Sequence, residues 1–130
     1  MAYIPKFRVW DKLNKEWDKD FTLSQDGELL SYGGIVFNKD NLEISFSSGK
    51  EDKNDKEIFN GDLVLIFNSK SPCNVEFQEG CFMLSDDHNW QPLSSFYSHS
   101  LEVVDNIYEN NKIFYPGNPM TEFLHELKGR

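Results

Sequence analysis

Short apolar runs alternate with clusters of turn-forming residues from Gly49 to Tyr108, and this pattern constrains the fold most strongly. A small β-barrel needs short strands that are separated by turns at regular intervals. Leu63–Phe67 is apolar at every position, which predicts a central strand, and Leu101–Tyr108 is expected to form the last long strand. Leu93–Tyr97 is expected to form a short helical turn that closes one end of the barrel. The pattern specifies a fold and carries no chemistry.

The N-terminal part of the chain has the pattern of antiparallel strands. Lys6–Val9 alternates, which should place Phe7 and Val9 on the inner face. Trp17–Leu23 follows a turn as a plausible return strand, and Leu42–Phe46 alternates apolar with polar residues. We therefore expect an N-terminal β-region.

A hairpin is predicted where Val75–Phe77 and Cys81–Leu84 flank a turn that contains Gly80. If Phe77 faces Cys81, then Cys73 lies about 13 Å away along its strand, at ~3.3 Å per residue. A disulfide needs Cα atoms within ~7 Å of one another. The two cysteines should therefore be free thiols.

A short helix is predicted near the C-terminus. Asn118 and Pro119 resemble a helix cap followed by proline at the first helical position. An apolar stripe follows at helical spacing, formed by Met120, Phe123, Leu124 and Leu127. The stripe either packs on the chain's own sheet or docks on a neighbouring subunit.

The predicted fold class is mainly β: an SH3-like β-barrel in the C-terminal half, an N-terminal antiparallel β-region and a short C-terminal helix. The expected divisions are residues 1–48, 49–115 and 116–130, joined in one compact unit. The 130 residues, 15% of them aromatic, are enough for such a core.

The chain carries 22 acidic and 13 basic residues, for a net charge of −9. An acidic surface repels a phosphate backbone, so nucleic-acid binding is disfavoured. It permits binding to a basic cleft on another protein, although an acidic surface often serves only solubility. No apolar run approaches the ~20 residues that cross a membrane, and no secretory signal is evident, so a cytoplasmic protein is expected.

We find no constellation of residues that predicts catalysis, a cofactor or a metal site. His88, His99 and His125 are far apart in the sequence and lack the spacing of metal ligands. Asp86 and Asp87 precede His88, but a solvated acidic turn is the better interpretation of this cluster. We therefore expect that the protein is not an enzyme.

The candidate contacts with a partner are few. Trp90 lies in a polar loop between Asn89 and Gln91, where an exposed ring would be an anchor for a partner. The acidic loop and the C-terminal stripe supply the other candidates, which are Asp86, Asp87, Phe123 and Leu127. Either a protein partner or self-association would use them.

Four segments, in order, resemble the YopX family of bacteriophage and prophage proteins. Lys6–Asp11 is close to K-F-R-A-W-D, and Asp52–Val64 is similar to D-K-N-G-K-E-I-Y-E-G-D-I-V. Val75–Phe82 resembles V-x-F-x-x-G-x-F, and Glu102–Asn110 resembles E-V-I-G-N-I-Y-E-N. The departures are Asp55 and Asp105 in place of glycine, and Asn111 in place of proline.

The resemblance implies an SH3-like barrel in a phage or prophage protein that acts in a bacterial cytoplasm, and it implies no reaction. The leading hypothesis is an accessory protein that works by protein–protein contact. One alternative is an acidic inhibitor that mimics nucleic acid toward a host nucleic-acid-binding or defence protein. The other is a nucleic-acid-binding SH3-like module, whose affinity would fall steeply with salt.

Overall fold

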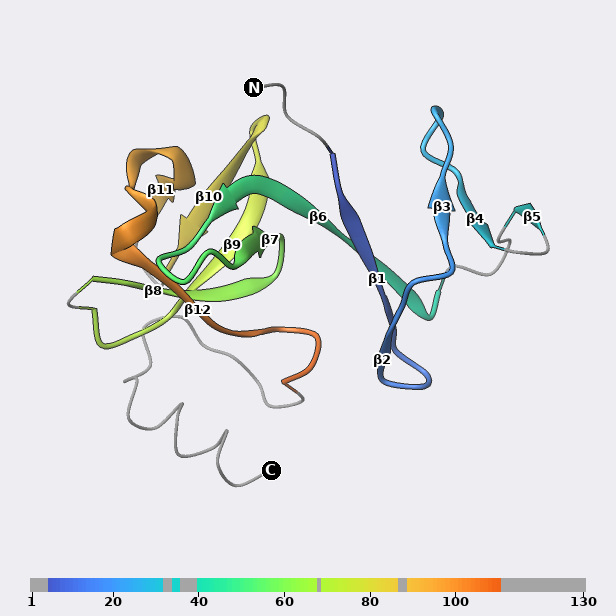
Figure 1. Cartoon of the computed structure of the whole chain (residues 1–130), viewed down its shortest axis with the longest axis horizontal. Helices are drawn as coiled ribbons and strands as arrows, with labels where there is room; N and C mark the ends of the chain where they lie inside the picture. Colours follow the sequence, from blue (N-terminus) through green and yellow to red (C-terminus); the bar gives the residue numbers. More distant parts are fainter. Residues whose placement is uncertain (1–4, 32–33, 36–39, 68, 87–88, 111–130) are drawn as a thin grey trace.

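The computed structural model describes residues 5–31, 34–35, 40–67, 69–86 and 89–110, which form three antiparallel sheets (Figure 1). The four-stranded sheet has the order β2-β1-β6-β7, with β1 (Phe7–Asp11), β2 (Glu16–Asp18), β6 (Leu42–Glu51) and β7 (Glu57–Phe59). The five-stranded sheet has the order β11-β10-β9-β8-β12, with β8 (Asp62–Ile66), β9 (Cys73–Gln78), β10 (Cys81–Ser85), β11 (Trp90–Pro92) and β12 (Leu101–Asn106). The three-stranded sheet has the order β3-β4-β5, with β3 (Thr22–Leu23), β4 (Leu29–Ser31) and β5 (Gly34–Ile35). Two short 3-10 turns, η1 (Leu93–Ser95) and η2 (Ser98–Ser100), precede β12.

The prediction of a mainly β, antiparallel fold is confirmed. In Figure 1 the long strand β6 extends from β1 and β2 to the five-stranded sheet, while β3, β4 and β5 lie at the far end of the molecule. β6 continues through residue 48, where the sequence placed a boundary between two regions.

The main core lies against the five-stranded sheet. Strand β8 lies between β9 and β12, so the predicted central strand is confirmed. Leu93 of η1 is buried in the same core, and the predicted helical turn is present there. The buried members of this core are Ile58, Val64, Cys73, Val75, Leu84, Leu93 and Leu101.

The predicted closed SH3-like barrel is not confirmed. Among the described residues the five-stranded sheet is open, because β11 and β12 are its two edges and do not pair. The turn after β6 covers part of the β12 edge instead. The Lys53 N–H donates to the Leu101 carbonyl (2.9 Å), and the Asp52 carboxylate accepts from the Val103 N–H (2.8 Å). The predicted helix within residues 116–130 lies outside the described part of the chain.

The β9–β10 hairpin is confirmed with a different register. Phe77 pairs with Phe82, and Gln78 pairs with Cys81, because Glu79 and Gly80 alone form the connection with positive φ angles of 52° and 80°. Cys73 is buried, Cys81 is exposed, and both are free thiols.

Strand β6 buries its polar face, against the simple expectation from its alternating sequence. Ser45 and Ser47 are fully buried, whereas Phe46 is 37% exposed. The serine hydroxyls have polar partners: Ser45 Oγ donates to the Asn60 carbonyl (2.6 Å), and Ser47 Oγ donates to the Glu57 carboxylate. Hydrogen bonding thus removes the cost of burying these groups.

Within the described residues, no helix has the length and apolar character that a membrane span requires.

Candidate functional site

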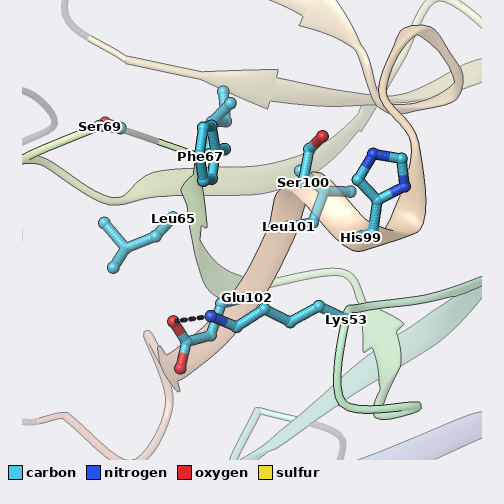
Figure 2. Close-up of a pocket in the computed structure, with 9 residues that line it drawn as sticks. Lys53, Leu65, Phe67, Ser69, His99, Ser100, Leu101 and Glu102 are labelled. Carbon is cyan, nitrogen blue, oxygen red and sulfur yellow. Dashed lines mark ion pairs between the residues drawn. The ribbon is translucent and has the colours of Figure 1, made fainter.

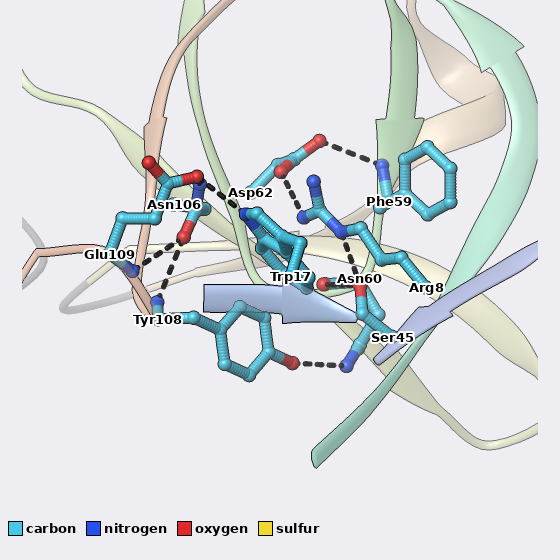
Figure 3. Close-up of polar contacts among 9 residues, drawn as sticks. All are labelled: Arg8, Trp17, Ser45, Phe59, Asn60, Asp62, Asn106, Tyr108 and Glu109. Carbon is cyan, nitrogen blue, oxygen red and sulfur yellow. Dashed lines mark hydrogen bonds and ion pairs between the residues drawn. The ribbon is translucent and has the colours of Figure 1, made fainter. Parts of the chain in front are cut away.

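Arg8 lies at the centre of a polar network that joins the two larger sheets (Figure 3). From β1, its guanidinium donates to Asp62 Oδ1 of β8 (2.7 Å) and to Ser45 Oγ of β6 (3.1 Å). The Asp62 side chain is only 2% exposed, and its other oxygen accepts from the Phe59 N–H (2.8 Å). One side chain therefore ties three strands together.

Two aromatic rings enclose the Arg8 guanidinium. Its central carbon lies 4.2 Å from the centroid of the Trp17 ring and 4.5 Å from that of Phe59. Cation–π attraction adds to the ion pair in this half-buried position. Burial raises the pKa of Asp62, and the charge of Arg8 works against that rise. The Arg8–Asp62 ion pair therefore links β1 of the four-stranded sheet to β8 of the five-stranded sheet.

The turn after β12 extends the same network. Asn106 Oδ1 accepts from the backbone N–H groups of Tyr108 (3.0 Å) and Glu109 (2.8 Å). The Glu109 carboxylate accepts from Trp17 Nε1 (2.7 Å), and this bond lowers the pKa of Glu109. The Tyr108 ring meets the Trp17 ring edge-on, with centroids 5.5 Å apart.

The network brings together the motifs that carry the family resemblance. Arg8 belongs to the first motif, Asp62 to the second, and Asn106, Tyr108 and Glu109 to the last. The groups in it are paired with one another: Arg8 with Asp62, and Glu109 with Trp17 and Asn106. The network supports a structural role, and sequence reasoning gave no role to any of these residues individually.

A second cluster lies on the surface, where β8 ends and β12 begins. We call it the Phe67–Tyr97 surface; its members are Phe67, Tyr97, His99, Lys53 and Glu102. Phe67 is 73% exposed and Tyr97 is 76% exposed. The Tyr97 and His99 rings stack nearly parallel, at 8°, with centroids 5.4 Å apart.

A small pocket opens between Phe67, His99, Lys53 and Glu102 of this surface (Figure 2). Its volume is about 130 Å³, and Phe67, Leu65, His99 and Leu101 are among the residues that line it. An ion pair between Lys53 and Glu102 (3.3 Å) lies at its rim. The pocket suits a single apolar side chain better than a substrate.

Backbone hydrogen bonds hold this surface in place. The Phe67 N–H donates to the Ser100 carbonyl (2.7 Å), and the Ser100 N–H donates to the Tyr97 carbonyl (2.9 Å). The end of β8 is thus tied to η2, and both aromatic residues are presented by a defined backbone. Preorganised aromatic side chains reduce the entropy cost of binding.

None of the contact residues predicted from the sequence belongs to the Phe67–Tyr97 surface. Trp90 is 47% exposed, as a partner anchor requires, but it lies in β11, at the opposite edge of the sheet from β12. The Asp86 Oδ1 accepts a hydrogen bond from the Asn89 N–H (2.8 Å). The other predicted contacts, Asp87, Phe123 and Leu127, lie outside the described residues. Contact of any of them with a partner stays a prediction.

The sequence analysis assigned Tyr97 to a short helical turn and Phe67 to a central strand. The polar residues around Tyr97 were a signal of its exposure. No signal marked Phe67, because it continues an apolar run and becomes exposed only where β8 ends at Ile66.

In the part of the chain that the structure describes, no group of three or more histidine, cysteine, aspartate or glutamate side chains could hold a metal ion.

Comparisons with known proteins agree on the fold. Protein EF1440 from Enterococcus faecalis has a similar structure, with a TM-score of 0.63 and 26% identity over 85% of this chain and 98% of that one. Protein yopX from Bacillus subtilis has a TM-score of 0.57 and 19% identity over 83% of this chain and 96% of that one. No curated protein matches by sequence. The family model described as YopX protein matches residues 6–114, and the chain therefore belongs to the YopX family.

Proposed function

We propose that this chain is a phage or prophage accessory protein that acts by contact with a protein partner through the Phe67–Tyr97 surface. The observation that carries the proposal is a pair of large aromatic side chains, Phe67 and Tyr97, both about three-quarters exposed. Phe67 lines a pocket of about 130 Å³, and Tyr97 stacks on His99, which lines the same pocket. Exposed aromatic residues contribute a large share of binding energy at protein interfaces. The polar network around Arg8 is the weaker candidate for a partner contact, because its groups already bond to one another and hold the two larger sheets together.

The charge of the chain indicates the chemistry of the partner. A net charge of −9 favours association with a basic protein surface and speeds the encounter at low salt. The pocket would take one aliphatic side chain of that partner. Lys53 and Glu102 at the rim would then limit which polar groups can flank this side chain.

Site-specific photo-crosslinking tests the location of the contact. A photoreactive phenylalanine analogue replaces Phe67 in one variant and Phe77 in a matched control, which is 58% exposed in β9. In a bacterial host lysate, the analogue at position 67 should give a discrete crosslinked product, and the analogue at position 77 should not. Equal crosslinking from both positions would contradict the proposal.

A second candidate function is an acidic inhibitor that mimics nucleic acid, and the excess of 22 acidic over 13 basic residues favours it. In such a complex, carboxylates occupy the sites of phosphates on the partner. Saturating DNA should then displace the chain from the captured partner. A complex that persists in excess DNA would exclude mimicry and leave the contact through the Phe67–Tyr97 surface intact.

A further inference from the structure

The Phe67–Tyr97 surface contains a carboxylate whose ion-pair partner is easily displaced. Glu102 Oε1 lies 3.3 Å from Lys53 Nζ, and the two side chains are 39% and 47% exposed. An ion pair between groups this exposed contributes little to stability. The Lys53 backbone is held by its N–H bond to the Leu101 carbonyl (2.9 Å), so only the long side chain has to move aside. Glu102 can therefore exchange this lysine for a cation of a partner.

Aromatic and aliphatic side chains surround this carboxylate. Figure 2 shows Phe67 and His99 on either side of Leu101, and Glu102 beside Lys53. All five residues line the pocket, together with Leu65. The pocket thus combines an apolar lining, two aromatic rings and one carboxylate.

The chain itself contains the same combination of groups around Arg8. The Arg8 guanidinium pairs with Asp62 (2.7 Å), and its central carbon lies 4.2 Å from the Trp17 centroid and 4.5 Å from the Phe59 centroid. A planar cation is well satisfied by a carboxylate and two ring faces. The pocket offers these three kinds of group to a guanidinium that a partner would supply.

We infer that the side chain which the partner inserts at this surface is an arginine. The inference rests on the proposed contact through the Phe67–Tyr97 surface and names its chemistry. The aliphatic stem of arginine can bury against Leu65, while its guanidinium forms two parallel hydrogen bonds to the Glu102 carboxylate. Lysine has a compact, strongly hydrated charge and makes a single-point contact instead.

The size of the pocket and the charge of the chain agree with this occupant. A cavity of ~150 Å³ accommodates a benzene ring, so a pocket of about 130 Å³ has room for a guanidinium, which is smaller. The net charge of −9 favours a basic segment over an acidic one.

Short peptides test this chemistry on the unaltered full-length protein, with the NMR chemical shifts of Phe67, His99 and Glu102 as the readout. The probes are an acetylated glycine-arginine-glycine amide and its counterparts with lysine or citrulline in place of arginine. Citrulline keeps the shape of arginine and lacks its charge. We expect the arginine peptide to shift these signals saturably, with a dissociation constant at least about fivefold lower than those of the other two. Equal dissociation constants for arginine and citrulline, or no saturable shift with arginine, would overturn the inference.

Three variants locate the guanidinium at Glu102. Glu102→Gln should bring the arginine and citrulline peptides to about equal affinity, because an amide cannot pair with the guanidinium as a carboxylate does. Lys53→Gln should strengthen binding of the arginine peptide about two- to threefold, since it removes the competing cation. The matched control is Glu43→Gln, whose carboxylate pairs with Lys12 at the same 3.3 Å on the four-stranded sheet, and it should change neither result. Weaker binding in Lys53→Gln, or equal effects of Glu43→Gln and Glu102→Gln, would overturn the assignment.

The photo-crosslink from position 67 reports separately on the proposed contact. A discrete crosslink together with equal binding of the three peptides would keep the contact and overturn the arginine. No crosslink together with a clear preference for arginine would overturn the contact and support the guanidinium site at Glu102.

Discussion

Arg8 shows how a single side chain can combine charge, hydrogen bonding and aromatic stacking at one junction. Its planar guanidinium donates to Asp62 and Ser45 while lying between the rings of Trp17 and Phe59. Lysine cannot reproduce this geometry, because its ammonium group is a compact point charge without a flat face.

Arg8→Ala should strongly destabilise the protein, because it leaves the buried Asp62 carboxylate without its partner. Removing one member of a buried pair costs about 3–5 kcal/mol. The free energy of unfolding from urea denaturation measures the effect. The matched control is Lys12→Ala, which breaks the exposed Lys12–Glu43 pair (3.3 Å) and should cost about 0–1 kcal/mol. An equal decrease in the free energy of unfolding in the two variants would show that Arg8 does not hold the two sheets together.

Gly61 permits the close approach of the Tyr108 ring. It has a φ of +90°, and a Cβ atom at this position would lie 2.8 Å from the Tyr108 hydroxyl oxygen. Gly27 has a similar φ of +84° with no atom within 4 Å of such a Cβ. Both glycines need a positive φ, but only at Gly61 would an added Cβ meet another side chain.

Gly61→Ala should therefore lower the melting temperature more than Gly27→Ala does. Gly27→Ala carries only the left-handed strain of about 1–2 kcal/mol. Gly61→Ala adds a steric term of about 1–3 kcal/mol, because the Tyr108 ring must move. Calorimetry on both variants checks the order; a larger loss for Gly27→Ala would contradict the packing described for Tyr108.

The residue-level contacts could not be predicted from one sequence. Arg8 and Asp62 are 54 positions apart, and periodicity reports which residues share a face of one strand without reporting which strands meet. The motifs that contain Arg8, Asp62 and Glu109 are visible in the sequence, but only the pairing of the strands shows that these three residues belong to one network.

At the scale of elements, the turn after β6 takes the place of a strand along part of the β12 edge. Asp52 organises it: one oxygen accepts from the N–H groups of Asn54 (2.8 Å) and Lys56 (2.9 Å), and the other accepts from the Val103 N–H. Burial tends to raise the pKa of Asp52, but these three backbone bonds outweigh it and lower the pKa.

Asp52→Asn should cost about 2 kcal/mol at neutral pH, since the amide can no longer accept from both sides. The folded-state pKa lies below the ordinary value of 3.8. Stability from Asp52 is therefore present above pH 3.8 and is lost as the pH falls through the lower, folded-state value. Urea denaturation across this range should show a smaller acid-induced loss in the variant than in the wild type. A constant difference at every pH would contradict the role of the carboxylate.

Several elements followed from local pattern alone. The β8 strand, the β9–β10 hairpin and the helical turn at Leu93 were all predicted, because runs of apolar residues and turn residues determine them locally. The hairpin register was wrong by one residue because it depends on the left-handed conformation of Glu79. The buried face of β6 could not be predicted, since its serines are buried by distant hydrogen-bond partners.

At the scale of the whole molecule, the structure is an assembly of open antiparallel sheets in place of the expected closed barrel. Closing a barrel depends on long-range pairing between edges, which no local pattern encodes. The exposure of Phe67 could not be predicted either. The sequence shows one apolar run, and only the fold shows that the neighbouring elements stop covering it after Ile66. Trp90 is 47% exposed, but it lies in strand β11 and not in the polar loop that the sequence indicated.

The most direct test of the proposed contact is the dissociation constant of the crosslinked partner for purified variants, measured by calorimetry. The double variant Phe67→Ala/Tyr97→Ala should bind at least ~30-fold more weakly than the wild type, as loss of a binding hot spot predicts. Phe77→Ala, an equally conservative change at another exposed phenylalanine, should bind as the wild type does. Unchanged affinity in the double variant, with its melting temperature preserved, would contradict the account.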